Sequence, residues 1–238
     1  MYYFKNIRTL KYFIRKIIKP DEITHLGVRL SVGDHTISDW IRDAIYKGFY
    51  EYAEGKLLEK YAHSDDRVLE IGGGIGFIGA KCKVCQYVAI YEANPDLIPI
   101  ISKNISNNEV NAKIINKAVT NNDSYNFIEI NIGDHFWNAS IMENNLKAKK
   151  VKVPAVSLHK ILKEHNPTFL IVDVEGYEIE LFNNIKFSKN VCKILIEYHP
   201  EKVGFDKTNL LREYFKKQGF TVVAKSRDSE LMIRSGDK

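Results

Sequence analysis

The sequence VLEIGGGIG occupies residues 68–76, and Glu92 follows its first glycine by twenty residues. An apolar strand leads into this glycine loop, and a second apolar stretch, residues 87–91, ends at the acid. In an open α/β sheet, glycines let a ligand approach the backbone, and an acid after the next strand accepts hydrogen bonds from ribose hydroxyls. The pattern predicts a site for a nucleoside-containing cofactor. The alternative is a tight turn whose glycines serve packing alone.

The residues around the loop distinguish between cofactors. The dinucleotide pattern G-x-G-x-x-G requires a glycine where Phe77 stands. Glu70 lies two residues before the first glycine, and its charge suits an ammonium group better than a pyrophosphate. S-adenosylmethionine carries an ammonium, a sulfonium and a ribose but no phosphate. The loop therefore predicts S-adenosylmethionine as the cofactor and disfavours NAD.

Composition bounds the class of protein. A chain of 238 residues can form one α/β domain with a modest extension. Its three cysteines, an odd number, argue against a disulfide framework and predict a reducing, cytoplasmic location. Cys82 and Cys85 form a C-x-x-C without a second pair, so no metal site is predicted.

Positive charge is concentrated at the N-terminus. Residues 1–20 contain six basic residues and no acid, and the remainder has 29 basic and 30 acidic residues. The nearly neutral body makes nucleic acid an unexpected partner. The N-terminal segment has the pattern of a basic amphipathic helix without the apolar core of a signal peptide or a spanning helix. Two interpretations are open: peripheral contact of residues 1–19 with an anionic membrane at its inner face, or docking on the body or a partner chain.

The chain divides into three predicted parts: a basic helix at 1–20, a hairpin and helix at 21–60 packing on the core, and a cofactor-binding domain at 61–238. Within the second part, residues 23–32 suggest a short hairpin. Ser38 could cap a single helix that runs to Leu57. Its aromatic stretch Tyr46-x-x-Phe49-Tyr50-x-Tyr52 could lie in the core or at an interface, and the helical spacing favours the core.

Strand and helix patterns then alternate. Strands are expected near 67–71, 87–91, 113–118, 168–172 and 192–197, and helices near 77–84, 95–107, 177–185 and 207–218. Runs at 125–131 and 150–156 suggest an inserted hairpin, and 219–224 with 230–233 a C-terminal one. This order predicts a Rossmann-like, mostly parallel sheet with helices on both faces and ligands at the carboxyl ends of its strands.

Polar residues follow two of these strands directly. Asp173 and Glu175 come after the run 169–172, and Glu197 and His199 end the next strand. Carboxylates there could hold an ammonium group, orient a hydroxyl or act as a general base, and histidine could also take a hydroxyl proton. The alternative for the acids is a helix N-terminus, where the macrodipole favours negative charge, and Glu178 fits this alternative well.

Several of these motifs together resemble the FkbM-type methyltransferases. The resemblance covers about residues 22–200 and rests on Glu70-x-Gly72…Gly76, Tyr91-Glu92-Ala93-Asn94-Pro95, Asn104, Ala118-Val119, Asp173-Val174-Glu175-Gly176-x-Glu178 and Glu197-Tyr198-His199. The first loop departs from the family's D-x-G-A-N-x-G, because Glu70 replaces the Asp and Gly73-Gly74 the Ala-Asn.

The resemblance implies a class I fold that binds S-adenosylmethionine. The implied cofactor-binding residues are Glu70, Gly72, Gly74, Gly76, Phe77, Glu92, Ala93, Asn104, Ala118 and Asp173, with Asn104 supporting the wall behind the cofactor. The implied catalytic residues are Asp173, Glu175 and His199. Asn138 and Ser140 match a polar stretch beside the adenine or the acceptor.

The expected function is S-adenosylmethionine-dependent O-methylation of a hydroxyl on a sugar, glycan or related small molecule. Two alternatives are an RNA methyltransferase and a catalytically silent methyltransferase fold that binds a partner. The near-neutral body and the lack of an N-P-P-Y-like segment disfavour the first. Absence of cofactor binding by the folded protein would favour the second. The identity of the acceptor and the oligomeric state are not predicted.

Overall fold

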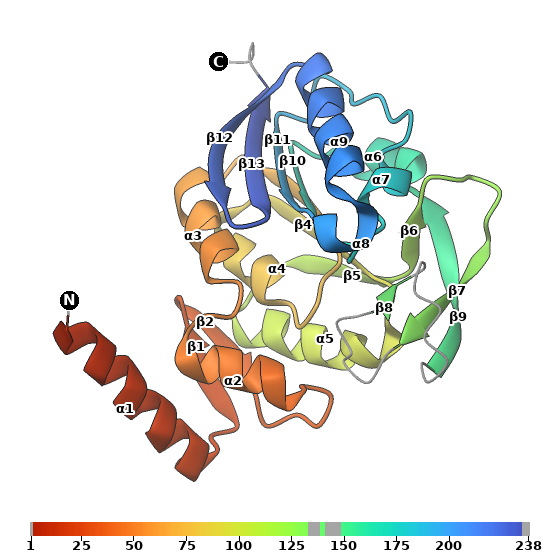
Figure 1. Cartoon of the computed structure of the whole chain (residues 1–238). Helices are drawn as coiled ribbons and strands as arrows, with labels where there is room; N and C mark the ends of the chain where they lie inside the picture. The colour runs from red at the N-terminus through yellow and green to blue at the C-terminus, as the bar shows by residue number, and fades with distance from the viewer. Residues whose placement is uncertain (1, 133–138, 141–148, 235–238) are drawn as a thin grey trace.

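A computed structural model describes the backbone of residues 2–132, 139–140 and 149–234, and the side chains of residues 9–132 and 149–234. Its centre is a seven-stranded sheet in the order β12-β13-β11-β10-β3-β4-β5 (Figure 1). The strands are β3 (Arg67–Ile71), β4 (Tyr87–Glu92), β5 (Ala112–Asn116), β10 (Phe169–Val172), β11 (Lys193–Glu197), β12 (Phe220–Ser226) and β13 (Ser229–Arg234). Neighbouring strands are parallel except at β13, which is antiparallel to both β11 and β12. The mostly parallel sheet and the C-terminal hairpin confirm the predicted fold class.

Helices cover both faces of this sheet, which explains its nearly continuous apolar strands. Alternate residues of β3 enter two separate cores: Val68 packs on one face, and Leu69 and Ile71 on the other. The first face is covered by α3 (Tyr52–Tyr61), α4 (Phe77–Lys81) and α5 (Ile98–Asn107). The second is covered by α6 (Leu158–His165), α7 (Glu178–Leu181) and α9 (Phe205–Lys217).

The chain order reverses next to β3. From β3 it proceeds outward to β4 and β5, and it later returns to β10 on the opposite side of β3. At this reversal the loops after β3 and β10 touch, because the Asp173 N–H donates to the Ile71 carbonyl at 3.0 Å. A Cβ on Gly72, where φ is +90°, would lie 1.8 Å from the Asp173 carbonyl oxygen, so only glycine fits. In α/β sheets such a reversal opens a crevice for ligands.

The N-terminal part contains α1 (Tyr2–Ile18), β1 (Glu22–His25), β2 (Val28–Ser31) and α2 (Asp39–Lys47). The antiparallel pairing of β1 with β2 confirms the predicted hairpin. The prediction of one helix from Ser38 to Leu57 is wrong. Gly48 ends α2 in the left-handed conformation, and Glu51 also has a positive φ before α3 begins. The chain therefore turns between α2 and α3.

This turn changes the environment of the aromatic residues around it. Tyr46 and Tyr50 are buried as predicted, but Phe49 and Tyr52 are 59% and 37% exposed. The prediction that the whole group lies in the core is wrong for these two, because the break in the helix redirects them outward.

A smaller sheet follows β5. The predicted strand 113–118 divides, since β6 (Ala118–Thr120) leaves the central sheet and pairs with β9 (Lys149–Ser157). The antiparallel pairing of β7 (Phe127–Ile132) with β9 confirms the inserted hairpin, and β8 (Ala139–Ser140) joins its edge. The remaining short elements are η1 (Cys82–Val84), η2 (Pro95–Leu97) and α8 (Pro200–Val203). Within the described residues, no helix combines the length and hydropathy needed to cross a bilayer.

Candidate active site

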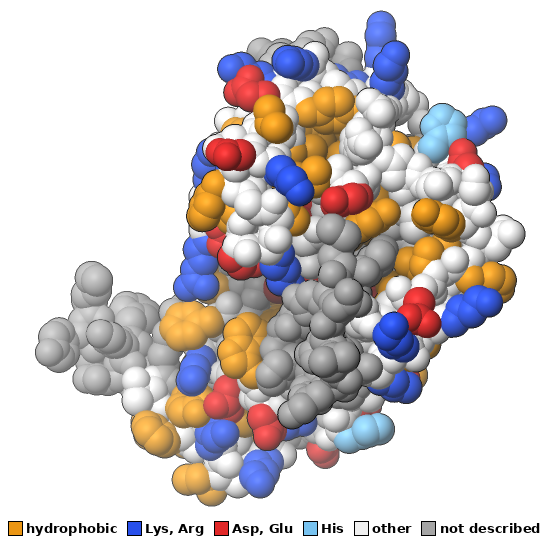
Figure 2. All heavy atoms as spheres, turned by 45° about the vertical axis from the view of Figure 1, so that its right-hand side comes forward, with side chains coloured by type: hydrophobic (Ala, Val, Ile, Leu, Met, Phe, Trp, Pro, Cys, Tyr) orange, Lys and Arg blue, Asp and Glu red, His pale blue; other side chains and the backbone are white. Residues whose placement is uncertain are grey.

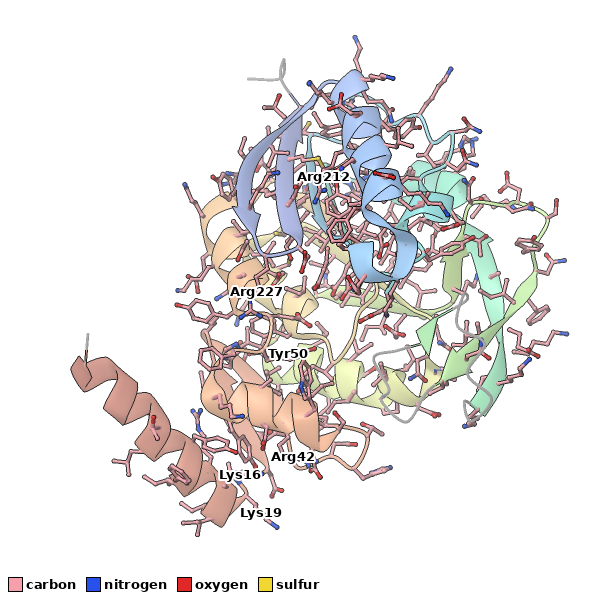
Figure 3. All side chains as sticks on the ribbon, viewed as in Figure 1. Lys16, Lys19, Arg42, Tyr50, Arg212 and Arg227 are labelled. Atoms are coloured by element: carbon pink, nitrogen blue, oxygen red, sulfur yellow. The ribbon has the colours of Figure 1, made fainter. Side chains whose placement is uncertain are left out.

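A cleft of about 690 Å³ lies over the carboxyl ends of the central strands. Strand ends contribute Gly72, Glu92 and Asp173 to its walls. The α2–α3 turn contributes Tyr50, and the β12–β13 turn contributes Arg227; Figure 3 shows both side chains on the same side of the molecule. The volume is in the range of small-molecule sites.

Glu92 organises the glycine loop. Its buried carboxylate accepts hydrogen bonds from the N–H groups of Gly73 at 2.9 Å, Gly74 at 3.1 Å and Asn94 at 2.7 Å. Burial raises the pKa of Glu92, and these backbone bonds counteract part of the rise. The Ala93 N–H also bonds to this carboxylate, so four backbone donors surround it, and Glu92 lines the cleft as well. Glu92 can therefore shape the loop and contact a ribose at once.

Six of the predicted cofactor-binding residues line the cleft: Gly72, Gly74, Glu92, Ala93, Ala118 and Asp173. Four others do not: Glu70, Gly76, Phe77 and Asn104. Asn138 and the side chain of Ser140 lie outside the part of the chain that the structure describes.

Glu70 lies in the interior beside α4 rather than at the cleft surface. Its Oε2 would be 2.8 Å from a Cβ placed on Gly79 and has no hydrogen-bond partner among the described residues. Burial, together with the charges of Glu51, Glu92 and Asp173, raises the pKa of Glu70 well above its usual range. The expected contact between Glu70 and an ammonium group has no support in this position.

Phe77 and Asn104 support the wall of the cleft from behind. The Phe77 ring is fully buried, with its centroid 6.0 Å from that of Tyr50. The amide of Asn104 donates to the Ile75 carbonyl at 2.7 Å and accepts from the Ser31 N–H at 2.8 Å. Asn104 therefore ties the glycine loop to the N-terminal hairpin.

The three residues predicted to be catalytic come together at one end of the cleft. Nε2 of His199 is 3.4 Å from Oε2 of Glu175 and 3.8 Å from Oδ1 of Asp173. Asp173 follows β10, and His199 follows the adjacent strand β11, so the parallel register brings them to the same edge. All three residues line the cleft.

Glu178 completes this cluster, although sequence reasoning favoured a helix N-terminal role for it. Its buried carboxylate accepts from Nδ1 of His199 at 2.7 Å and from the Gly176 N–H at 2.9 Å. The sequence signal was the third acid of D-x-E-G-x-E. Its contact with His199 depends on the turn at Gly176, which the spacing alone does not reveal.

Opposing effects set the protonation of the cluster. Burial lowers the pKa of His199, but the bond to Glu178 and the charges of Asp173 and Glu175 raise it to about 9 overall. Burial and the neighbouring Glu175 raise the pKa of Asp173 to about 7, while His199 lowers it. At neutral pH, His199 is therefore a cation, and Asp173 is the group that can take up a proton.

The cleft is acidic, which sequence reasoning did not anticipate. Burial, followed by nearby acids, raises the pKa of Glu51 to about 8 and that of Glu197 to about 9. Its lining includes eight acids, Glu51, Glu54, Glu92, Asp173, Glu175, Glu197, Glu201 and Asp228, of which Glu51 and Glu197 are mostly neutral at pH 7, against Lys117, Lys202, Arg227 and the cationic His199. This balance is opposite in sign to the net charge of +5 for the whole chain.

Asp173, Glu175 and His199 could also hold a cation, since each offers a ligand atom and these atoms lie within 4.8 Å of one another. The ammonium of Lys202 already lies 2.7 Å from Oε2 of Glu175. One of the three potential ligands is therefore neutralised by a residue of the chain itself.

A seven-stranded sheet with one antiparallel strand, a glycine loop at the chain reversal and an acid after β4 define a nucleoside-cofactor fold of the methyltransferase class. The model of the methyltransferase FkbM domain matches residues 71–222, and the chain belongs to this family of S-adenosylmethionine-dependent methyltransferases. No characterised protein matches the chain significantly by sequence.

Solved structures with a similar fold are distant in sequence. A tRNA methyltransferase of M. jannaschii is 14% identical with a TM-score of 0.45, covering 90% of this chain and 57% of its own. A tRNA uracil methyltransferase of Pyrococcus abyssi, in complex with S-adenosyl-L-homocysteine, is 12% identical with a TM-score of 0.48, covering 90% and 43%. Precorrin-6y C5,15-methyltransferase of Geobacter metallireducens is 12% identical with a TM-score of 0.47, covering 78% and 89%. The chain thus spans about half the length of the two tRNA enzymes.

Proposed function

We propose that this methyltransferase acts on a hydroxyl group of a sugar, glycan or related small molecule. The observation that carries the proposal is the position of Asp173, whose pKa is about 7, beside His199 and Glu175 in the cleft. An alcohol needs its proton removed as it attacks, and a carboxylate that titrates near neutrality suits that task.

The cofactor site suits S-adenosylmethionine. Gly74 lines the cleft with φ +52°, so the glycine loop presents its backbone there without a side chain and a ligand can approach it closely. In the proposed arrangement, Glu92 binds the ribose and Ala93 and Ala118 contact the adenine. The cofactor supplies a methyl group activated by its bond to a sulfonium.

Asp173 is the proposed general base. The acceptor oxygen bonds to the methyl carbon, the carbon–sulfur bond breaks with its electron pair on sulfur, and the hydroxyl proton passes to Asp173. Glu175, held by Lys202, orients the acceptor. The His199 cation, fixed by Glu178, stabilises the Asp173 carboxylate before the transfer.

The lining of the cleft favours an uncharged or cationic acceptor. The described lining lacks the excess of basic residues that binds a phosphate backbone, which opposes the RNA alternative. At the cleft wall, Trp40 and Phe49 are 62% and 59% exposed, with Tyr52 beside them. Aromatic faces of this kind can pack against the apolar face of a sugar ring.

The experiment has two stages. Calorimetric titration of the purified protein with S-adenosylmethionine, with NAD as the control, tests the site. Methyl transfer from labelled cofactor is then measured on a panel of sugars and glycans, with RNA as the competing acceptor. Micromolar binding followed by labelling of a sugar hydroxyl supports the proposal. Labelling of RNA alone would contradict the proposal that the acceptor is a sugar or glycan. If a cooperatively melting protein binds neither S-adenosylmethionine nor NAD, the catalytically silent methyltransferase fold is favoured instead.

We further propose a reducing, cytoplasmic environment. No disulfide joins any two of Cys82, Cys85 and Cys192. Thiol labelling of the protein extracted from cells without reductant should modify Cys85 and Cys192, and their protection as disulfides would contradict this location.

A further inference from the structure

The N-terminal helix α1 contacts the body of the protein through its polar side. The Tyr12 hydroxyl donates to Asp43 of α2 at 3.2 Å, and Lys16 forms an ion pair with the same carboxylate at 2.9 Å. The guanidinium of Arg15 donates to the Tyr46 carbonyl at 2.7 Å. Figure 3 shows Lys16 where α1 approaches α2. Polar contacts of this kind therefore join the helix to α2.

The opposite side of α1 is an apolar surface that faces away from the body. It consists of Leu10, Phe13, Ile14, Ile17 and Ile18, which are 61%, 57%, 44%, 81% and 67% exposed. Their spacing of three, four, seven and eight residues from Leu10 places them on one stripe of the helix. In a globular domain such a stripe normally faces the core, so the orientation of α1 is reversed. Among the described residues, nothing covers this stripe.

We propose that the exposed stripe of α1 binds the surface of an anionic lipid bilayer. Lys11 on the same helix and Lys19 directly after its end are both exposed, and residues 1–20 carry six basic residues and no acid. An apolar stripe flanked by cations is the pattern of a helix that lies in the lipid interface. Apolar and basic side chains lie next to each other at the lower left of Figure 2, in the region of α1 and α2.

Charge selects the lipid surface over a second copy of the chain. Pairing two such stripes would bring together two segments that each carry six basic residues and no acid of their own, with Asp43 of α2 forming an ion pair only with Lys16 among the described residues of the segment. An anionic bilayer instead attracts each basic residue near its surface. The stripe would lie in the interface plane rather than span the bilayer.

The test is cosedimentation of the full-length protein with phosphatidylcholine vesicles, with and without about one-third phosphatidylglycerol. The variant Ile14→Asp/Ile17→Asp places two acids in the stripe. The matched control is Phe205→Asp/Leu210→Asp, because both residues lie on α9 and are 71% exposed. Cooperative melting and cofactor affinity show that each variant is folded.

We expect the wild type and the α9 variant to bind the anionic vesicles and the α1 variant to bind roughly tenfold less. Binding to pure phosphatidylcholine should be weaker, and salt should reduce binding to the anionic vesicles. Equal binding by the α1 variant, or no binding by the wild type, would overturn the proposal. So would a dimer in light scattering that the α1 variant converts to a monomer, since the stripe would then join two copies.

Discussion

Nδ1 of His199 lies 2.7 Å from Oε1 of Glu178, and neither side chain is more than one-tenth exposed. This bond fixes the ring so that Nε2 faces Glu175 and Asp173. A buried carboxylate that holds one histidine nitrogen controls the charge and direction of the other. Glu178 is therefore a positioning residue for the cluster.

Replacing Asp173 with Asn should lower kcat by about 10²–10⁴-fold, because the amide keeps the shape of the side chain but cannot accept the proton. Calorimetry should find the affinity for S-adenosylmethionine changed only a few-fold. The control is Glu213→Gln, an exposed acid of α9. If Asp173→Asn turns over at the wild-type rate, Asp173 is not the general base.

The dependence of kcat/KM on pH should be bell-shaped. Asp173 must lose its proton, so activity rises through about pH 7, and His199 must keep its proton, so activity falls near pH 9. The variant Glu178→Gln removes the anion that raises the pKa of His199. Its descending limb should therefore move to lower pH, with the ascending limb displaced less. If the descending limb of Glu178→Gln stays at the wild-type pH, that limb does not report the loss of the His199 proton.

Replacing Glu92 with Ala should weaken the binding of S-adenosylmethionine by about 1–3 kcal/mol, the cost of losing a charged buried acceptor. The same variant leaves the N–H groups of Gly73 and Gly74 without the Glu92 acceptor, so the glycine loop also loses two hydrogen bonds that fix its conformation. Glu109→Ala removes an exposed acid and serves as the control. A dissociation constant that stays at the wild-type value would show that Glu92 does not contact the cofactor.

The sequence was sufficient for the parts of the site that are encoded locally. Apolar strands followed by polar residues identify Glu92, Asp173 and His199, because parallel strands bring their carboxyl ends to one edge. The side to which the Glu70 side chain points could not be predicted from this pattern. It alternates with Leu69 and Ile71 along β3 and so faces α4 rather than the cleft.

Residues that reach the cleft from elsewhere were missed for a different reason. Glu51 enters the cleft only because α2 ends at Gly48, and the apolar spacing through residues 40–57 concealed that break. A glycine within a helical pattern was the available signal. Arg227 depends on how the last hairpin folds over the strand ends, which no local pattern specifies.

Stability should decrease between about pH 5 and pH 9. Burial raises the pKa values of Glu51 and Glu197 to about 8 and 9, so both are neutral in the folded protein at pH values where the unfolded chain is ionised. The raised pKa of His199 acts in the same direction, since its stabilising charge is lost as pH rises toward 9. Melting temperatures measured across this range should show a smaller decline in Glu197→Gln. An equal decline would exclude Glu197 as a source of the effect.

Turnover should not require a divalent cation. The ligand atoms of Asp173, Glu175 and His199 converge, but His199 is protonated near neutral pH and the Lys202 ammonium lies on Glu175. A metal would have to displace a proton from the first and an ammonium from the second. Activity measured with EDTA should therefore equal that with added Mg²⁺ or Mn²⁺ within about twofold. The variant Lys202→Met removes the competing ammonium, so any latent affinity for a cation should increase in it. Loss of wild-type activity in EDTA, with recovery on adding Mg²⁺, would instead make the cluster a metal centre and change the role of Asp173 from base to ligand.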